Sequence, residues 1–125
     1  MTARILIVED SALLALDLGQ ALETAGFEVI GPALSVEQAL ALIENPGCDA
    51  AMLDINLRGS TSEQIAHKLL ALAIPFVTLT GYASAQRPSI FDGIPAITKP
   101  VRLPELISEL RRCLGLPPDE LHSAK

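Results

Sequence analysis

The chain has 125 residues, of which 50% are hydrophobic and only 3% aromatic, and its formal net charge is −6. This length suits one domain that buries about two thirds of its unfolded surface without disulfides. Its nine lysines and arginines are scattered along an acidic chain and form no basic cluster. Composition therefore argues against binding to a nucleic-acid backbone or an anionic membrane, and favours a core of Ala, Leu, Ile and Val.

The cysteines and histidines give no sign of a soft-metal or redox site. Cys48 and Cys113 form no CxxC pair, and His67 and His122 are interpreted as surface residues. The chain starts without a signal-peptide pattern, and no apolar stretch approaches the roughly 18 residues that a membrane span needs. We therefore expect a cytoplasmic protein.

Short apolar segments alternate with segments of helical hydrophobic spacing along the chain. The apolar segments, which we interpret as strands, are residues 5–8, 27–33, 50–54, 75–80 and 95–98. Helices are expected at residues 12–25 and 36–44, in a third segment that holds Ile65, Ala66 and Leu69, and at residues 104–114. Residues 83–94 are expected to hold one short helix at most, because Pro88 and Asp92-Gly93 interrupt them.

Capping residues support these boundaries. Ser11 is a suitable N-cap for the first helix, and Gly26 supplies its left-handed end. Residues 35–38 and 60–63 both have the Ser-x-x-Gln/Glu pattern of a capping box. Pro104 stands at the expected first position of the last helix.

The strand over residues 50–54 organises the predicted fold. Its apolar run has no polar alternation, which is typical of a strand with helices on both faces. Strands alternating with helices predict a parallel sheet with right-handed crossovers. We therefore predict an α/β, flavodoxin-like, doubly wound (βα)5 sandwich with a five-stranded parallel sheet in the order 2-1-3-4-5.

Polar residues follow the strands of this predicted sheet where their carboxyl ends meet. They are Glu9, Asp10, Asp54, Thr80 and Lys99. Asp54 alone could simply cap a loop, Thr80 could be an ordinary strand residue and Lys99 a solvated lysine. Their convergence on the usual ligand-binding edge of an open α/β sheet favours a functional site.

The three acids of this set predict a cation. Two carboxylates about 4 Å apart repel by roughly 4 kcal/mol at an effective dielectric near 20. Oxygen ligands without His or Cys favour Mg²⁺, which in turn favours phosphate. A carboxylate can then attack phosphorus while Mg²⁺, Lys99 and the Thr80 hydroxyl neutralise the phosphoryl oxygens, and Gly81 leaves room for the incoming group.

The order and spacing of these motifs resemble a response-regulator receiver domain of bacterial two-component signalling over about residues 4–114. The matching motifs are Glu9-Asp10, Asp54, Thr80-Gly81 and Lys99-Pro100. The resemblance implies one receiver domain over residues 1–116, with a short tail at 117–125. It also implies a cis peptide between Lys99 and Pro100, which an X-Pro bond makes inexpensive.

The resemblance further implies the role of each site residue. Asp54 would be the phosphoacceptor, and Thr80 and Lys99 would bind the phosphoryl group. The implied Mg²⁺ ligands are Asp10 and Asp54 directly, Glu9 mostly through water, and the backbone carbonyl of Asn56. A histidine kinase or histidine phosphotransfer protein would donate the phosphoryl group to a signalling protein that is not an enzyme, although it assists its own phosphorylation and dephosphorylation.

Two features depart from the common receiver pattern. Ala96 stands where receivers usually carry a switch aromatic, and the segment from Thr80 to Lys99 is short. The aromatic is instead Tyr82, directly after Thr80-Gly81, which resembles the stand-alone FATGUY group of receivers in its Thr-Gly-Tyr part. We therefore predict a switch made of Thr80, Gly81 and Tyr82.

Two other classes share parts of this pattern. An Asp-nucleophile phosphohydrolase of the haloacid-dehalogenase type uses Asp-x-Asp, whereas residues 54–56 here are Asp-Ile-Asn. A flavodoxin would have its cofactor phosphate repelled by the two acids after the first strand. The sequence favours a single-domain response regulator that signals by phosphorylation-dependent protein contact or acts as a phosphate shuttle or sink, with an unknown downstream partner.

Overall fold

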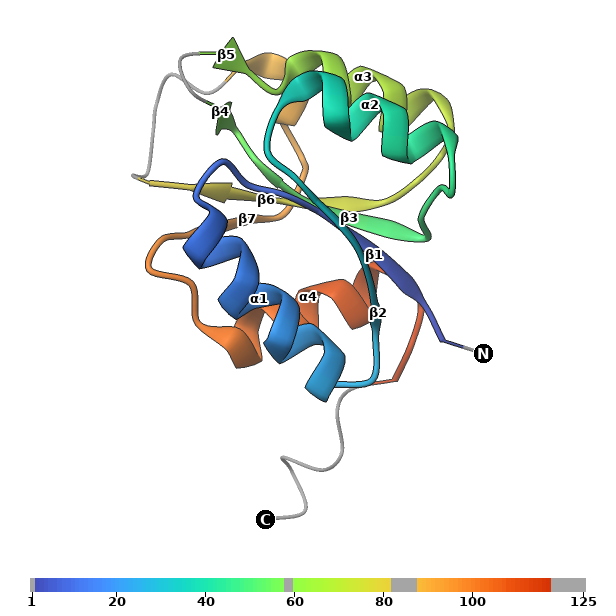
Figure 1. The fold of residues 1–125 in the computed structure, drawn as a ribbon, viewed down its shortest axis with the longest axis vertical. Helices are drawn as coiled ribbons and strands as arrows, with labels where there is room; N and C mark the ends of the chain where they lie inside the picture. The colour runs from blue at the N-terminus through green and yellow to red at the C-terminus, as the bar shows by residue number, and fades with distance from the viewer. Residues whose placement is uncertain (1, 58–59, 82–87, 118–125) are drawn as a thin grey trace.

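The computed structural model describes residues 2–57, 60–81 and 88–117 and contains a five-stranded parallel sheet between two layers of helices (Figure 1). The sheet has the order β2-β1-β3-β6-β7. Its strands are β1 (Arg4–Val8), β2 (Glu28–Ala33), β3 (Ala50–Asp54), β6 (Phe76–Thr80) and β7 (Ala96–Thr98). Counted within this sheet alone, the order is the predicted 2-1-3-4-5, so the doubly wound flavodoxin-like fold is confirmed.

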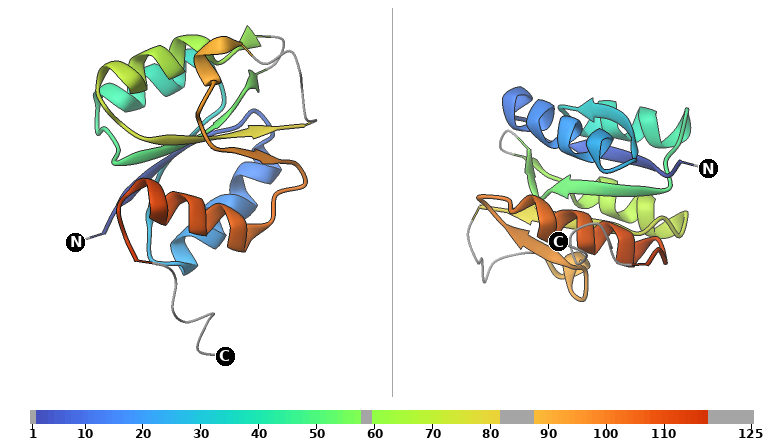
Figure 2. Two further views of the ribbon diagram at one scale, coloured as in Figure 1. Left: turned by 180° about the vertical axis from the view of Figure 1, so that it is seen from behind. Right: turned by 90° about the horizontal axis from the view of Figure 1, so that it is seen from below.

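Helices cover both faces of the sheet. One face carries α1 (Ala12–Thr24) and α4 (Leu103–Cys113). The other carries α2 (Val36–Glu44), α3 (Glu63–Ala71) and the 3₁₀ helix η1 (Ser89–Phe91). Figure 2 shows the same two layers from behind and from below. In the described part of residues 83–94, η1 is the short helix that the sequence allowed.

The central strand β3 is buried along its whole length, as its unbroken apolar sequence predicts. Its side chains alternate between two cores, because successive residues of a strand point to opposite faces. Ala50 and Met52 pack with α1 and α4, whereas Ala51 and Leu53 pack with α2 and α3. β3 thus separates the two cores and carries Asp54 to the carboxyl edge of the sheet.

Two of the predicted N-caps are present. The Oγ atoms of Ser11 and Ser35 accept hydrogen bonds from Leu14 N (3.3 Å) and Gln38 N (3.2 Å), respectively. Both bonds satisfy donors at helix N-termini that have no intrahelical partner.

Two helix starts were predicted wrongly. The expected capping box at residues 60–63 does not form, because Ser60–Thr61 is strand β5, antiparallel to β4 (Asn56–Leu57). This extended pair delays the helix, so Ser62 is the N-cap of α3. In α4, Arg102 is the N-cap and Leu103 the first helical residue, which places Pro104 second.

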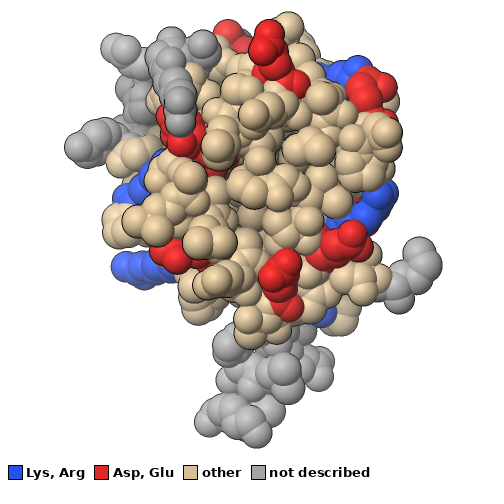
Figure 3. Space-filling model, in the orientation of Figure 1, with Lys and Arg blue, Asp and Glu red and all other residues tan. Residues whose placement is uncertain are grey.

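Charged groups are interspersed over the described part of the face shown in Figure 3, with no continuous basic patch. This distribution agrees with the composition, which argued against an anionic polymer as partner. Within the described ranges, no helix is long and apolar enough to cross a membrane.

Phe91 should contribute more to stability than its place in a three-residue helix suggests. Its side chain is 0% exposed and packs in the core between the sheet and the α2–α3 layer. We expect Phe91→Ala to lower the free energy of unfolding by about 3–5 kcal/mol, because it leaves a cavity. Urea denaturation measures this change. Leu13→Ala, at a side chain 73% exposed, is the control and should change stability by less than about 0.5 kcal/mol; equal effects would contradict the packing.

Candidate acidic site at the carboxyl edge of the sheet

Three carboxylates meet at the carboxyl edge of the sheet. Glu9 and Asp10 directly follow β1, and Asp54 ends the neighbouring strand β3. One oxygen of each lies within 4.8 Å of the others. Glu9 is 0% exposed and Asp54 5%, while Asp10 is partly exposed. Strand adjacency therefore creates the acidic cluster that the sequence predicted.

Lys99, which follows β7, reaches into this cluster. Its Nζ donates a hydrogen bond to Asp54 Oδ2 (2.9 Å) and lies 3.1 Å from Glu9 Oε1. Burial alone would lower the pKa of Lys99, but the hydrogen bond and charge of Asp54, together with those of Glu9, raise it above its ordinary value. Lys99 is therefore a permanent cation at neutral pH that bridges two acids. The peptide between Lys99 and Pro100 is cis, as the family resemblance implied.

The carboxylate of Glu9 is fully buried, and its two oxygens have different partners. Its Oε2 accepts a hydrogen bond from Ser11 N (2.9 Å), whereas Oε1 is buried and has no partner of hydrogen-bond geometry in the described part of the chain. Burial, followed by the charge of Asp54, raises the pKa of Glu9, against the opposing effects of the Ser11 N–H and Lys99. Oε1 thus has an ion pair with Lys99 but spare capacity as a ligand.

Both carboxylate oxygens of Asp54 have donors. Oδ2 binds Lys99, and Oδ1 accepts a hydrogen bond from the backbone N of Asn56 (3.1 Å). The Asn56 side chain is exposed at the start of β4. The backbone N–H of Asn56, two residues after Asp54, therefore donates a hydrogen bond to the acid that ends β3.

Thr80 and Gly81 complete the set that the structure brings to this edge. Thr80 ends β6 and is 8% exposed, and its backbone carbonyl accepts a hydrogen bond from Lys99 N (2.8 Å). A Cβ placed at Gly81 would meet no described atom within 4 Å, which agrees with the open approach expected there. Tyr82 lies outside the described residues, so its role as the moving part of a switch stays a prediction.

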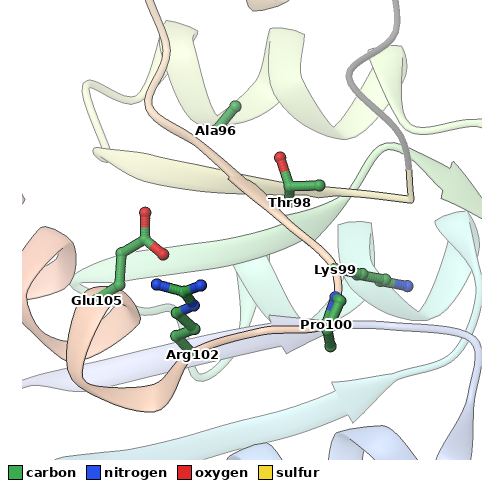
Figure 4. A pocket seen from close by; sticks show the side chains of 6 residues that line it. All are labelled: Ala96, Thr98, Lys99, Pro100, Arg102 and Glu105. Atoms are coloured by element: carbon green, nitrogen blue, oxygen red, sulfur yellow. The ribbon is translucent and has the colours of Figure 1, made fainter.

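A surface pocket of about 320 Å³ lies beside β7, where receivers usually carry the switch aromatic. It is lined by Ala96, Thr98, Lys99, Pro100, Arg102 and Glu105. In Figure 4 the Lys99 side chain extends away from Arg102 and Glu105. Ala96 therefore lines open space that adjoins Lys99.

The acidic cluster fits a hard divalent cation. Its ligands are oxygens, its carboxylates repel one another, and the buried Oε1 of Glu9 has an ion pair with Lys99 but no partner of good hydrogen-bond geometry among the described residues. In the described ranges, no His or Cys belongs to the cluster, which disfavours zinc. The residues present therefore suit Mg²⁺.

Comparison with known families agrees with this geometry. The sequence model of the response regulator receiver domain matches residues 5–111, so the chain belongs to this family of two-component signalling proteins. Receiver domains take phosphoryl groups from histidine kinases or phosphotransfer proteins and bind Mg²⁺ at an acidic pocket. This chain has an acidic cluster of Glu9, Asp10 and Asp54.

Individual relatives carry the same domain. The transcriptional regulatory protein PdtaR of Mycobacterium tuberculosis is 29% identical over 83% of this chain and 53% of its own length. The phosphate regulon transcriptional regulatory protein PhoB of Pseudomonas aeruginosa is 33% identical over 88% of this chain and 51% of its own. The chain therefore spans about half the length of the curated relatives it matches.

A solved structure shows the same fold over the full domain. The CheY-like response regulator receiver domain protein of Methanospirillum hungatei superposes with a TM-score of 0.83 at 30% sequence identity. The match covers 92% of this chain and 95% of that one. The receiver fold of this chain is thereby established.

Glu9→Gln should stabilise the metal-free protein. Because burial raises the pKa of Glu9 above 4.5, the folded chain binds a proton more tightly than the unfolded chain does. The contribution of Glu9 to the free energy of unfolding is therefore greatest below pH 4.5. This contribution falls as the pH rises through the raised pKa of the folded state. At neutral pH with a chelator, we expect a gain of about 1.4 kcal/mol for each unit of that rise.

Denaturation at several pH values, with and without Mg²⁺, measures this effect. Glu37→Gln, at an exposed acid of α2, is the matched control and should change little. Mg²⁺ should then stabilise the wild type more than Glu9→Gln, because the cation relieves the repulsion that the substitution removes. A Glu9→Gln variant less stable than the wild type at neutral pH would contradict this interpretation.

Proposed function

We propose that this chain accepts a phosphoryl group on Asp54 from a histidine kinase or a histidine phosphotransfer protein, in a Mg²⁺-dependent reaction. The observation that carries the proposal is the arrangement around Asp54: two further acids within 4.8 Å and the Lys99 ammonium 2.9 Å from Oδ2. A lone structural ion pair would not need three acids. A phosphoacceptor needs both a cation site and a fixed positive side chain.

In the proposed reaction, a carboxylate oxygen of Asp54 forms a bond to phosphorus while the bond from phosphorus to the donor's histidine nitrogen breaks. The histidine leaves with that electron pair and takes up a proton from solvent. Lys99 and the Thr80 hydroxyl are proposed to bind the phosphoryl oxygens, over which the negative charge is spread in the transition state. Lys99 is already at the site, and its raised pKa keeps it charged.

Glu9, Asp10, Asp54 and the Asn56 carbonyl are the proposed holders of Mg²⁺. When bound, the cation would supply positive charge to the phosphoryl oxygens and relieve the repulsion between the acids. Glu9 contributes a buried oxygen that is ion-paired with Lys99 but has no partner of good hydrogen-bond geometry among the described residues, and Asp10 is partly exposed. Both features favour a cation that enters from solvent and keeps some of its water.

The family favours a signalling role rather than turnover of a substrate. Receiver domains are generally signalling phosphoacceptors, and the chain would act by phosphorylation-dependent protein contact or as a phosphate shuttle or sink. We place this activity in the cytoplasm as part of the proposal. The phosphohydrolase alternative gains no support, because position 56 holds Asn rather than a second acid.

Phosphorylation should depend on Asp54 and on Mg²⁺. With a small acyl-phosphate donor and Mg²⁺, we expect the wild type to gain one phosphoryl group that is lost on mild base treatment. Asp54→Ala or a chelator should abolish this gain, because each removes the acceptor or the charge that supports transfer. Intact-protein mass spectrometry measures it. Asp17→Ala, at an exposed acid of α1, is the control and should behave like the wild type; a phosphoryl group that persists in Asp54→Ala would disprove the assignment.

Lys99 should act on the phosphoryl group rather than on the cation. We expect Lys99→Ala to keep Mg²⁺ binding but to lower the phosphorylation rate by about 10²-fold or more, the usual effect of removing a preorganised positive group. Rapid-quench time courses and the Mg²⁺-induced melting shift measure the two properties. Lys68→Ala, which breaks the ion pair with Glu44 between α3 and α2, is the control. An unchanged rate in Lys99→Ala would remove Lys99 from the proposed reaction.

A further inference from the structure

Ser62 makes an unusual pair of contacts at the start of α3. Its backbone N and its Oγ both donate hydrogen bonds to the carbonyl oxygen of Ile55, at 2.9 and 3.0 Å. Ser62 is 0% exposed, and although it is the N-cap of α3, its side chain makes no capping hydrogen bond. The hydroxyl therefore binds the segment after β3 and does not cap the helix.

The carbonyl of Ile55 belongs to the peptide unit that contacts Asp54. A trans peptide is planar, so its C=O and N–H point in opposite directions. In the peptide between Ile55 and Asn56, the C=O accepts from Ser62, and the N–H donates to Asp54 Oδ1 (3.1 Å). Holding one end of this rigid unit fixes the direction of the other.

The remaining contacts of Ile55 restrict the same segment from the sheet side. Ile55 N donates to the carbonyl of Leu79 in β6 (3.2 Å), and the Ile55 side chain is 4% exposed. Two donors on the Ile55 oxygen occupy both of its lone pairs. The peptide that follows Ile55 is therefore held on both sides, and so is the donor that it presents to Asp54.

We propose that Ser62 is a positioning residue for Asp54, which it orients through the Ile55–Asn56 peptide. This inference rests on the proposed role of Asp54 as phosphoacceptor. Lys99 fixes Oδ2 of Asp54 and the Asn56 N–H fixes Oδ1, so the carboxylate is oriented by a donor on each oxygen. Removing the Ser62 hydroxyl leaves one donor on the Ile55 carbonyl and lets the peptide, and with it the carboxylate, turn.

Thr78 provides a matched control elsewhere in the sheet. It is also 0% exposed, and its backbone N and Oγ1 both donate to one carbonyl oxygen, that of Pro95, at 2.9 and 3.1 Å. Pro95 precedes β7, at the end of that strand opposite to the acidic site. Thr78→Val and Ser62→Ala therefore remove the same kind of hydrogen bond. Only the carbonyl that Ser62 binds, that of Ile55, belongs to the peptide that contacts Asp54.

The first measurement is the amide resonance of Asn56 in ¹H–¹⁵N NMR spectra of the metal-free protein. We expect Ser62→Ala to move the Asn56 amide proton to a lower chemical shift, which indicates a weaker hydrogen bond, and to speed its hydrogen exchange. Thr78→Val should have little effect on either. A loss of stability alone would affect both variants alike and would not single out Asn56. An Asn56 amide that is unchanged in Ser62→Ala would overturn the proposal.

The second measurement is the rate of Asp54 phosphorylation by a small acyl-phosphate donor with Mg²⁺. We expect Ser62→Ala to be slower by about fivefold, the factor that one hydrogen bond is usually worth, and Thr78→Val to match the wild type. Equal rates in all three proteins would overturn the proposal even if the amide shifts. If the wild type is not phosphorylated at all, the proposed function fails. The NMR measurement on the Asn56 amide then decides by itself whether Ser62 positions the N–H that donates to Asp54.

Discussion

The concentration of negative charge at one edge of the sheet is the constraint on which this structure depends. Glu9, Asp10 and Asp54 bring carboxylate oxygens within 4.8 Å of one another, and two of the three acids are almost fully buried. At such separations each pair repels by several kcal/mol at an effective dielectric of about 20. The fold tolerates this because Lys99 bridges Glu9 and Asp54.

The same constraint connects the fold to its proposed chemistry. Parallel strands bring residues that are far apart in sequence to one edge, where they need a cation and can hold an anion. Lys99 neutralises part of the charge, since its one positive charge faces three acids, and its contact with Glu9 Oε1 (3.1 Å) lacks good hydrogen-bond geometry. Asp54 is held between the ammonium and a backbone N–H, so the structure orients this acid for the proposed phosphoryl transfer.

Much of this could be predicted from the sequence, because the signals are local. Strands buried on both faces are apolar throughout, so Asp54 at the end of such a strand is conspicuous, and topology then places it near Lys99. The start of α3 could not be predicted, because a serine-rich segment suits a cap and a short extended pair equally well. Ser62 was overlooked for the same reason: its partner Ile55 lies seven residues earlier, on the far side of that pair.

The central claim is that these acids, Lys99 and Thr80 form a single site for a cation and a phosphoryl group. Beryllofluoride, which mimics a phosphoryl group on a carboxylate, tests this directly when followed by backbone NMR. With Mg²⁺ present, we expect shifts centred on the amides of Asp54, Asn56, Thr80 and Lys99, and none of them with Mg²⁺ omitted. Shifts that do not require Mg²⁺, or that centre elsewhere on the chain, would contradict the account.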